Sequence, residues 1–228
     1  MSRPTHICRD DQLPMTICRH YSGQHYSVLF NQNTGFFVRA EDKGYPEPFW
    51  AASGPELMDI SITNCCDREC PTCYRSSRSD GRHMTLCDYE LLIAQASRLG
   101  VLQVALGGGN PNQHPDFPEI IEMTRRKYNI VPSYSTNGRG LTSEVIAATK
   151  TFCGAVAVSA YPPFDEMEAA LNRLGEEGVK PAIHFILNRA SIDCAIDWLL
   201  KPPRFLRRAR AVVFLNYKPL GRGADTSL

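Results

Sequence analysis

The sequence has 228 residues, 43% of them hydrophobic, which suits one domain with a substantial core and a small appendage. Lys and Arg total 25 against 24 Asp and Glu, so no basic excess indicates a nucleic acid partner. No apolar run is long enough to cross a bilayer, and the N-terminus lacks the apolar core of a signal peptide. We therefore expect a cytoplasmic protein that does not enter a membrane.

The first 56 residues are predicted to form a small β-hairpin extension. Apolar runs at 27–30 and 36–39 flank a turn sequence at 31–35, a pattern typical of a hairpin. A stretch rich in Pro and Gly follows at 44–55 and is expected to join this extension to the rest of the chain. We therefore divide the chain into an extension over 1–56 and a domain over 57–228.

From Leu57 onward, predicted strands and helices alternate. The strands are expected at 57–63, 102–106, 131–135, 155–159, 182–187 and 211–216. The helices are expected at 88–99, 117–128, 142–151, 165–177 and 192–200, several of them beginning at cap-like residues: Thr142, Asp165 and Ser191. Continuous apolar strands are typical of a parallel sheet that is buried on both faces.

The predicted fold class is therefore α/β, a partial TIM-like (β/α)6 barrel with a small N-terminal β-hairpin extension. A complete barrel has eight units, so this one is expected to be open on one side. No helix follows the sixth predicted strand to cover it. The extension, a partner, or a shortened chain would each account for this, and the sequence does not choose among them.

Four of the nine cysteines crowd between Cys65 and Cys73, which indicates a metal or cluster site more than a disulfide framework. Cys66, Cys70 and Cys73 have the spacing Cys-x3-Cys-x2-Cys and directly follow the first strand of the domain, at the end where barrel active sites lie. Nine scattered cysteines would form roughly 0.01 such triplets by chance. Three thiolates can hold three irons of a cubane cluster and leave the fourth iron open to a ligand.

Two other metal sites fit the same segment. A structural zinc ion could take the three motif cysteines with His83 or Cys65, although such sites usually draw paired ligands from two separated segments. The spacing Cys-x4-Cys-x2-Cys that starts at Cys65 is of the plant ferredoxin type and needs a distant fourth ligand. Cys153 and Cys194 are the candidates in the barrel, but we interpret them, and Cys87, as buried small hydrophobic residues.

The motif resembles the hallmark of the radical S-adenosylmethionine (radical SAM) superfamily, and the resemblance covers about residues 57–217. It implies a [4Fe-4S] cluster on Cys66, Cys70 and Cys73 whose open iron binds S-adenosylmethionine (SAM). It also implies reductive cleavage of SAM to a 5′-deoxyadenosyl radical, with electrons from a low-potential donor such as a flavodoxin or ferredoxin. The cofactors would carry the hard chemistry, and the protein would position and shield them.

A glycine run after the second predicted strand carries a second resemblance. Gly108, Gly109 and Asn110, followed by Pro, are similar to the family's Gly-Gly-Glu-Pro element, which contacts the methionine ammonium of SAM. The usual carboxylate is replaced by Asn110, and a hydrogen bond to a charged group is roughly twice as strong as a neutral one. We therefore expect weaker cofactor binding, or a compensating acid elsewhere.

Further cofactor-binding candidates end the later strands. The resemblance suggests Ser135 and Asn137 at the end of the third strand, Ser159 at the end of the fourth and Asn188 at the end of the fifth. Ser135, Asn137 and Ser159 could instead be capping or turn residues. His184, inside the fifth strand, is interpreted as a core histidine.

The resemblance predicts a radical SAM enzyme with an unidentified substrate. An open-sided barrel suits a bulky substrate such as a peptide or protein, and the hairpin could pair with an extended peptide. The alternative is a non-catalytic iron–sulfur binding or electron-transfer module on the same scaffold, which Asn110 and the short C-terminus favour. Binding of SAM distinguishes the two, because an electron-transfer module needs no such cofactor.

Overall fold

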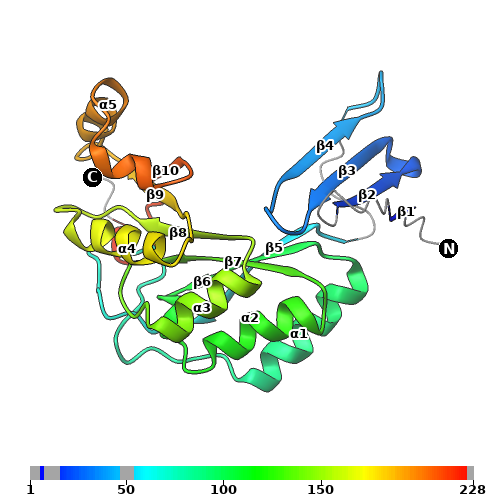
Figure 1. Ribbon diagram of the computed structural model, residues 1–228, viewed down its shortest axis with the longest axis horizontal. Helices are drawn as coiled ribbons and strands as arrows, with labels where there is room; N and C mark the ends of the chain where they lie inside the picture. Colours follow the sequence, from blue (N-terminus) through cyan, green and yellow to red (C-terminus); the bar gives the residue numbers. More distant parts are fainter. Residues whose placement is uncertain (1–5, 8–15, 47–53, 225–228) are drawn as a thin grey trace.

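The structure is a computed structural model that describes residues 6–7, 16–46 and 54–224. Within these ranges it contains a six-stranded parallel sheet in the order β10-β9-β8-β7-β6-β5 and a four-stranded antiparallel sheet in the order β1-β2-β3-β4 (Figure 1). The strands of the parallel sheet are β5 (Leu57–Thr63), β6 (Gln103–Gly108), β7 (Val131–Thr136), β8 (Ala155–Ser159), β9 (Ala182–Leu187) and β10 (Val212–Asn216). The α-helices are α1 (Leu86–Leu99), α2 (Phe117–Arg126), α3 (Ser143–Phe152), α4 (Asp165–Glu176) and α5 (Ile192–Leu200).

Each βα unit adds its strand beside the preceding one, so the parallel sheet grows in chain order as a barrel does. Figure 1 shows α1, α2 and α3 side by side along the outer face of the curved sheet. Apolar strand residues such as Leu106, Val156 and Val158 are buried against helix residues such as Ile120 and Leu171. The predicted partial barrel is confirmed, with every predicted strand and helix of the barrel present.

The helix ends follow from local chemistry. The Thr142 side chain accepts a hydrogen bond from the Val145 amide at the start of α3, as predicted for a cap. The Thr85 side chain does the same for the Asp88 amide at the start of α1, and Gly100, just after this helix, has a left-handed conformation. Ser191 precedes α5 but makes no capping hydrogen bond with its side chain.

The N-terminal extension contains more than the predicted hairpin. The pair β3 (Tyr26–Asn31) and β4 (Phe37–Glu41) confirms the hairpin, and β1 (His6–Ile7) and β2 (Thr16–Tyr21) add two antiparallel strands on its other side. The polar residues Arg19 and His20 interrupt the apolar pattern of β2, so the sequence did not predict this strand. The predicted joint at 44–55 lies largely outside the described residues.

The antiparallel sheet packs against the beginnings of the parallel strands. Tyr26, Val28 and Phe30 of β3 form a small core with Leu102 and Val131, which stand at the starts of β6 and β7. Glu56, the residue just before β5, is buried, and its carboxylate accepts hydrogen bonds from the Tyr26 hydroxyl (3.1 Å) and Arg39 Nε (2.9 Å). The extension therefore covers the N-terminal end of the barrel, opposite the strand ends where barrel active sites lie.

The last unit of the barrel is less covered. Val213 and Leu215 on β10 remain more than a third exposed, as do Leu199 and Leu200 on α5. The extension reaches only the start of β10, where Arg210 Nη1 donates to the Thr34 carbonyl (3.4 Å). Among the described residues, the extension does not cover this strand. No helix in the same ranges is long and apolar enough to cross a membrane.

Candidate cluster and cofactor site

A cavity of about 610 Å³ opens at the carboxyl ends of the parallel strands. This volume lies within the range of ordinary cofactor pockets, about 300–1,000 Å³. Eight of the predicted site residues line it: Cys66, Cys70, Cys73, Gly108, Gly109, Ser135, Asn137 and Ser159. Asn110 and Asn188 do not. Because the strands are parallel, residues that lie up to 93 positions apart in the sequence meet at this one edge of the sheet.

The three motif cysteines lie on a loop, residues 64–78, which we call the cysteine loop. Its two ends are joined by main-chain hydrogen bonds from Cys66 N to Arg78 O (2.8 Å) and from Arg78 N to Asn64 O (3.2 Å). The Thr63 hydroxyl, at the end of β5, accepts a hydrogen bond from Cys65 N (2.9 Å). The loop therefore has a defined shape that is anchored to the end of the first barrel strand.

Two adjacent cysteines of this loop have different surroundings. Cys66 lines the cavity, whereas the Cys65 thiol points to the Ser79 carbonyl at 3.3 Å and is not part of the lining. This placement favours the spacing that starts at Cys66 over the ferredoxin-type spacing that starts at Cys65. Cys153 and Cys194 pack against the hydrophobic core, as predicted. The prediction that Cys87 is buried is wrong, because this residue is exposed in the first turn of α1.

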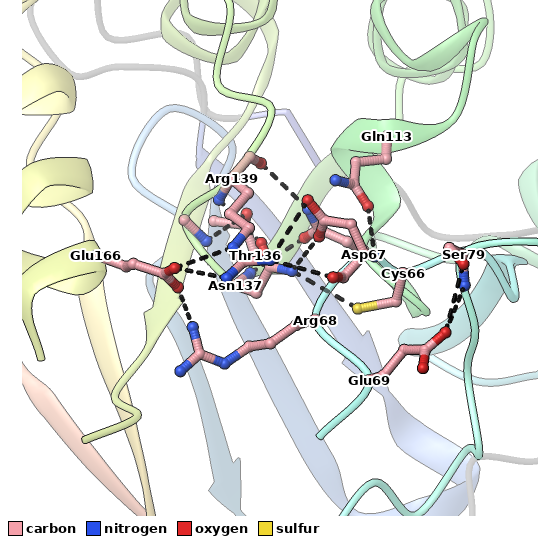
Figure 2. A network of polar contacts seen from close by, with 12 residues as sticks. Cys66, Asp67, Arg68, Glu69, Ser79, Gln113, Thr136, Asn137, Arg139 and Glu166 are labelled. Carbon is pink, nitrogen blue, oxygen red and sulfur yellow. Dashed lines mark hydrogen bonds and ion pairs between the residues drawn. The ribbon is translucent and has the colours of Figure 1, made fainter. Parts of the chain in front are cut away.

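A polar network fixes the cysteine loop to the neighbouring strand end (Figure 2). Asn137, just after β7, donates from Nδ2 to Asp67 Oδ1 (3.1 Å) and approaches the Cys66 sulfur at 3.6 Å. Arg139 Nη1 donates to the Asp67 carbonyl (3.1 Å). The Asn137 side chain therefore contacts the motif cysteine Cys66 directly and also holds Asp67, the next residue of the loop, in place.

Glu166 at the start of α4 completes the network. Its carboxylate pairs with Arg139 (2.6 Å) and with Arg68 of the cysteine loop. The hydrogen bond from Arg139 is the main reason that the pKa of Glu166 lies below its usual range. Single exposed ion pairs contribute about 0–1 kcal/mol each, so the importance of Glu166 lies in joining two loops and a helix.

Asn110 has a supporting position beneath the cavity, where only 1% of its surface is exposed. Its Oδ1 accepts from Asn137 N (3.0 Å), and its Nδ2 donates to the Arg139 carbonyl (3.1 Å). Both ends of the amide are thus used by the main chain of the loop after β7. A glutamate could accept the first bond but could not donate the second. This geometry gives Asn110 a role in shaping the loop after β7, and its contact with the cofactor stays a prediction.

Asn188 is likewise used locally. Its Oδ1 accepts from Ser191 N (2.9 Å), and its own amide donates to the Ser191 hydroxyl (2.9 Å). These reciprocal bonds close the turn before α5. Asn188 therefore closes a local turn in this structure, and its contact with the cofactor stays a prediction.

The deeper wall of the cavity carries polar side chains on an apolar surface. The Ser135 hydroxyl lies 3.2 Å from His184 Nδ1, and both residues line the cavity. Burial lowers the pKa of His184, which favours the neutral imidazole. The histidine that we interpreted as a core residue therefore borders the site and has a partner within it.

Sequence reasoning missed several residues of this site. Tyr161 packs beside Cys70, and burial raises the pKa of both the Tyr161 hydroxyl and the Cys70 thiol. Arg222, near the C-terminal end of the described chain, also lines the cavity. No local pattern marks these residues, because each meets the cysteine loop only through the fold.

A comparison of the sequence with protein-family models identifies the domain. Residues 60–160 match the model of the radical SAM superfamily. The match begins within β5, contains the three motif cysteines and ends just after β8. Over these residues the chain matches the radical SAM superfamily. The cofactors of this family are a [4Fe-4S] cluster and SAM.

Curated relatives agree with this assignment. The mycofactocin maturase MftC of Mycolicibacterium smegmatis is 27% identical over 187 residues, which are 75% of this chain and 47% of the relative. A probable GTP 3′,8-cyclase of Pyrococcus horikoshii is 40% identical over 82 residues, which are 36% of this chain and 26% of the relative. The chain therefore spans about half the length of the first of these relatives, and about a quarter of the second.

A solved structure shares the fold of this chain. Streptococcus suis SuiB, crystallised with the precursor peptide SuiA, superimposes with a TM-score of 0.66 at 14% identity. The match covers 86% of this chain and 61% of SuiB. At this identity the likeness concerns the fold alone.

The residues present fit the family's cofactors. Three thiols border one cavity, and the Asn137 amide lies beside one of them. Arg222 also lines this cavity, and its buried Nη2 has no partner among the described residues. No three His, Cys, Asp or Glu side chains of the described ranges converge as a single metal ion requires. A cubane cluster does not require its ligands to converge on one point, because each thiolate binds a different iron atom.

Proposed function

We propose that this chain is a radical SAM enzyme in which Cys66, Cys70 and Cys73 hold a [4Fe-4S] cluster with one iron open to SAM. The observation that carries the proposal is that these three thiols, and not the adjacent Cys65, line the cavity at the carboxyl ends of the parallel strands. When bound, the cluster and SAM supply a one-electron cleavage that produces a 5′-deoxyadenosyl radical.

The polypeptide has three tasks in this reaction. It holds the thiolates in place through the cysteine loop and the Asn137 network. It orients SAM through the main chain at Gly108 and Gly109 and through the hydroxyls of Ser135 and Ser159, which share the cavity. Apolar residues of the lining exclude water, which protects a reactive radical from side reactions: Ile60, Leu106, Ile186 and Leu215.

The proposed substrate is a peptide or protein. SuiB, whose fold covers most of this chain, was crystallised with a precursor peptide, and the cavity mouth lies beside a β10 strand with exposed apolar side chains. The predicted pairing of a peptide with the hairpin would place it on the edge strand β4, at the opposite end of the barrel from the cavity. We therefore locate substrate entry at the mouth. A flavodoxin or ferredoxin in the cytoplasm is the proposed electron donor.

Cleavage of SAM tests this function. The chain is reconstituted with iron and sulfide without oxygen, reduced with dithionite and incubated with SAM, and 5′-deoxyadenosine is measured by mass spectrometry. We expect product from the wild type and from Cys87→Ala, since Cys87 is exposed on α1 and outside the cavity. We expect only background product from the triple variant Cys66→Ala, Cys70→Ala, Cys73→Ala.

Two outcomes would overturn the proposal. An intact cluster that yields no product would make the chain the non-catalytic iron–sulfur module. Zinc bound by the three cysteines, with no iron incorporated on reconstitution, would make it a zinc-stabilised domain.

A further inference from the structure

Arg222 lies in a short turn near the C-terminal end of the described chain and reaches back to the cysteine loop. Its amide donates to the Cys73 carbonyl (3.0 Å), its Nε to the Cys70 carbonyl (3.0 Å) and its Nη1 to the Ser77 carbonyl (2.8 Å). One residue thus holds three main-chain oxygens of the loop, two of them on motif cysteines. The planar guanidinium suits this task because its donors have fixed directions.

The turn that carries Arg222 is built for this close approach. At Gly221, with φ of +60°, a Cβ atom would lie 2.6 Å from the Tyr74 carbonyl oxygen and 2.7 Å from that of Cys73. Only a glycine permits both this backbone conformation and this contact. The Tyr217 hydroxyl donates to the Gly223 carbonyl and closes the turn on itself. The contact is therefore specified by several residues in addition to the arginine.

The remaining nitrogen of Arg222 is unusual. Nη2 is buried and has no hydrogen-bond partner among the described residues, while Arg222 lines the same cavity as Cys70 and Cys73. A buried donor without a partner is costly, and a buried cationic donor more so. The guanidinium charge at the cavity lining also favours a negatively charged occupant, and a thiolate-ligated cluster is one.

We propose that Arg222 is a positioning residue for the cluster: it clamps the cysteine loop through three carbonyls and places its guanidinium charge beside the cavity that would hold the cluster. This inference rests on the proposed function. Hydrogen bonds and positive charge beside a cluster raise its reduction potential. Residues that orient metal ligands typically change metal affinity by about 10–100-fold when they are removed. Arg222 therefore affects both how long iron is retained and how readily the cluster is reduced.

The test compares Arg222→Gln and Arg222→Lys with the matched control Arg207→Gln, an exposed arginine outside the cavity. Each protein is reconstituted anaerobically. The rate of iron release to a chelator and the reduction potential, from a titration followed by electron paramagnetic resonance, are then measured. We expect Arg222→Gln to release iron about ten-fold faster or more and to have a lower potential. Arg222→Lys keeps the positive charge but loses the fixed donor geometry of the guanidinium. Its reduction potential is therefore expected to lie between those of the wild type and Arg222→Gln. The control is expected to match the wild type.

The outcomes separate this inference from the proposed function. If the wild type binds no [4Fe-4S] cluster, the proposed function fails. If the wild type binds the cluster and Arg222→Gln has the wild-type release rate and potential, the role of Arg222 is wrong. Should Arg222→Gln fold poorly, Gly221→Ala moves the turn while keeping the guanidinium, and unchanged iron release in that variant would overturn the clamp.

Discussion

Replacing Cys66 with Ser is expected to abolish cluster assembly, whereas the same change at the adjacent Cys65 is expected to leave it intact. Cys66 lines the cavity with Cys70 and Cys73, while the Cys65 thiol is directed at the Ser79 carbonyl. A serine hydroxyl is a poor substitute for a soft thiolate ligand of iron. Iron and sulfide content after reconstitution should fall from about four irons per chain to near zero in Cys66→Ser only.

The pair of variants also controls for folding. Both cysteines lie on the same loop, and neither belongs to the hydrophobic core. Thermal unfolding of the iron-free proteins should therefore be similar for Cys65→Ser, Cys66→Ser and the wild type. Loss of iron from Cys65→Ser with retention in Cys66→Ser would contradict the assignment and would support the ferredoxin-type spacing.

Gly109→Ala is expected to disrupt the site by separating β6 from the cysteine loop. A Cβ atom at Gly109 would lie 2.0 Å from the Cys65 carbonyl oxygen and 2.6 Å from its carbon, both of them main-chain atoms. The same carbonyl accepts a hydrogen bond from Asn110 N (2.8 Å). Relief of the overlap must move the loop. We expect a loss of about 2–4 kcal/mol in the free energy of unfolding, from overpacking and broken hydrogen bonds.

Gly107→Ala is the matched control for this change. Gly107 lies two positions earlier on β6 and lines the same cavity, but a Cβ atom there meets nothing within 4 Å. Its effect on the free energy of unfolding should stay within about 0.5 kcal/mol. Urea unfolding of the iron-free proteins, followed by iron analysis after reconstitution, measures both effects. Equal losses in the two variants would refute the steric argument.

The barrel could be predicted from sequence because each βα unit carries its own signals. Apolar strands such as β8 and caps such as Thr142 are local features, and they place these elements within a few residues. The motif cysteines could be found in the same way, since three ligands within eight residues form a local pattern. The strand β2 was missed because Arg19 and His20 interrupt its hydrophobic pattern.

Side-chain roles at the strand ends were harder to predict. The resemblance placed Asn110 and Asn188 at the correct edge of the sheet, but it could not show that both amides are occupied by nearby protein groups. The contacts that hold the cysteine loop span long separations: Arg68 and Glu166 are 98 residues apart, and Arg222 and Cys70 are 152 apart. Only the folded chain brings such pairs together.

The central claim is that the cavity holds a [4Fe-4S] cluster with one iron available to SAM. The most direct measurement is the electron paramagnetic resonance spectrum of the dithionite-reduced, reconstituted protein before and after addition of SAM. A cluster on Cys66, Cys70 and Cys73 should give a signal that changes when SAM binds the open iron, and Cys65→Ser should give the same change. A cluster signal that SAM leaves unaltered would contradict the claim, because it would mean that every iron already has a protein ligand.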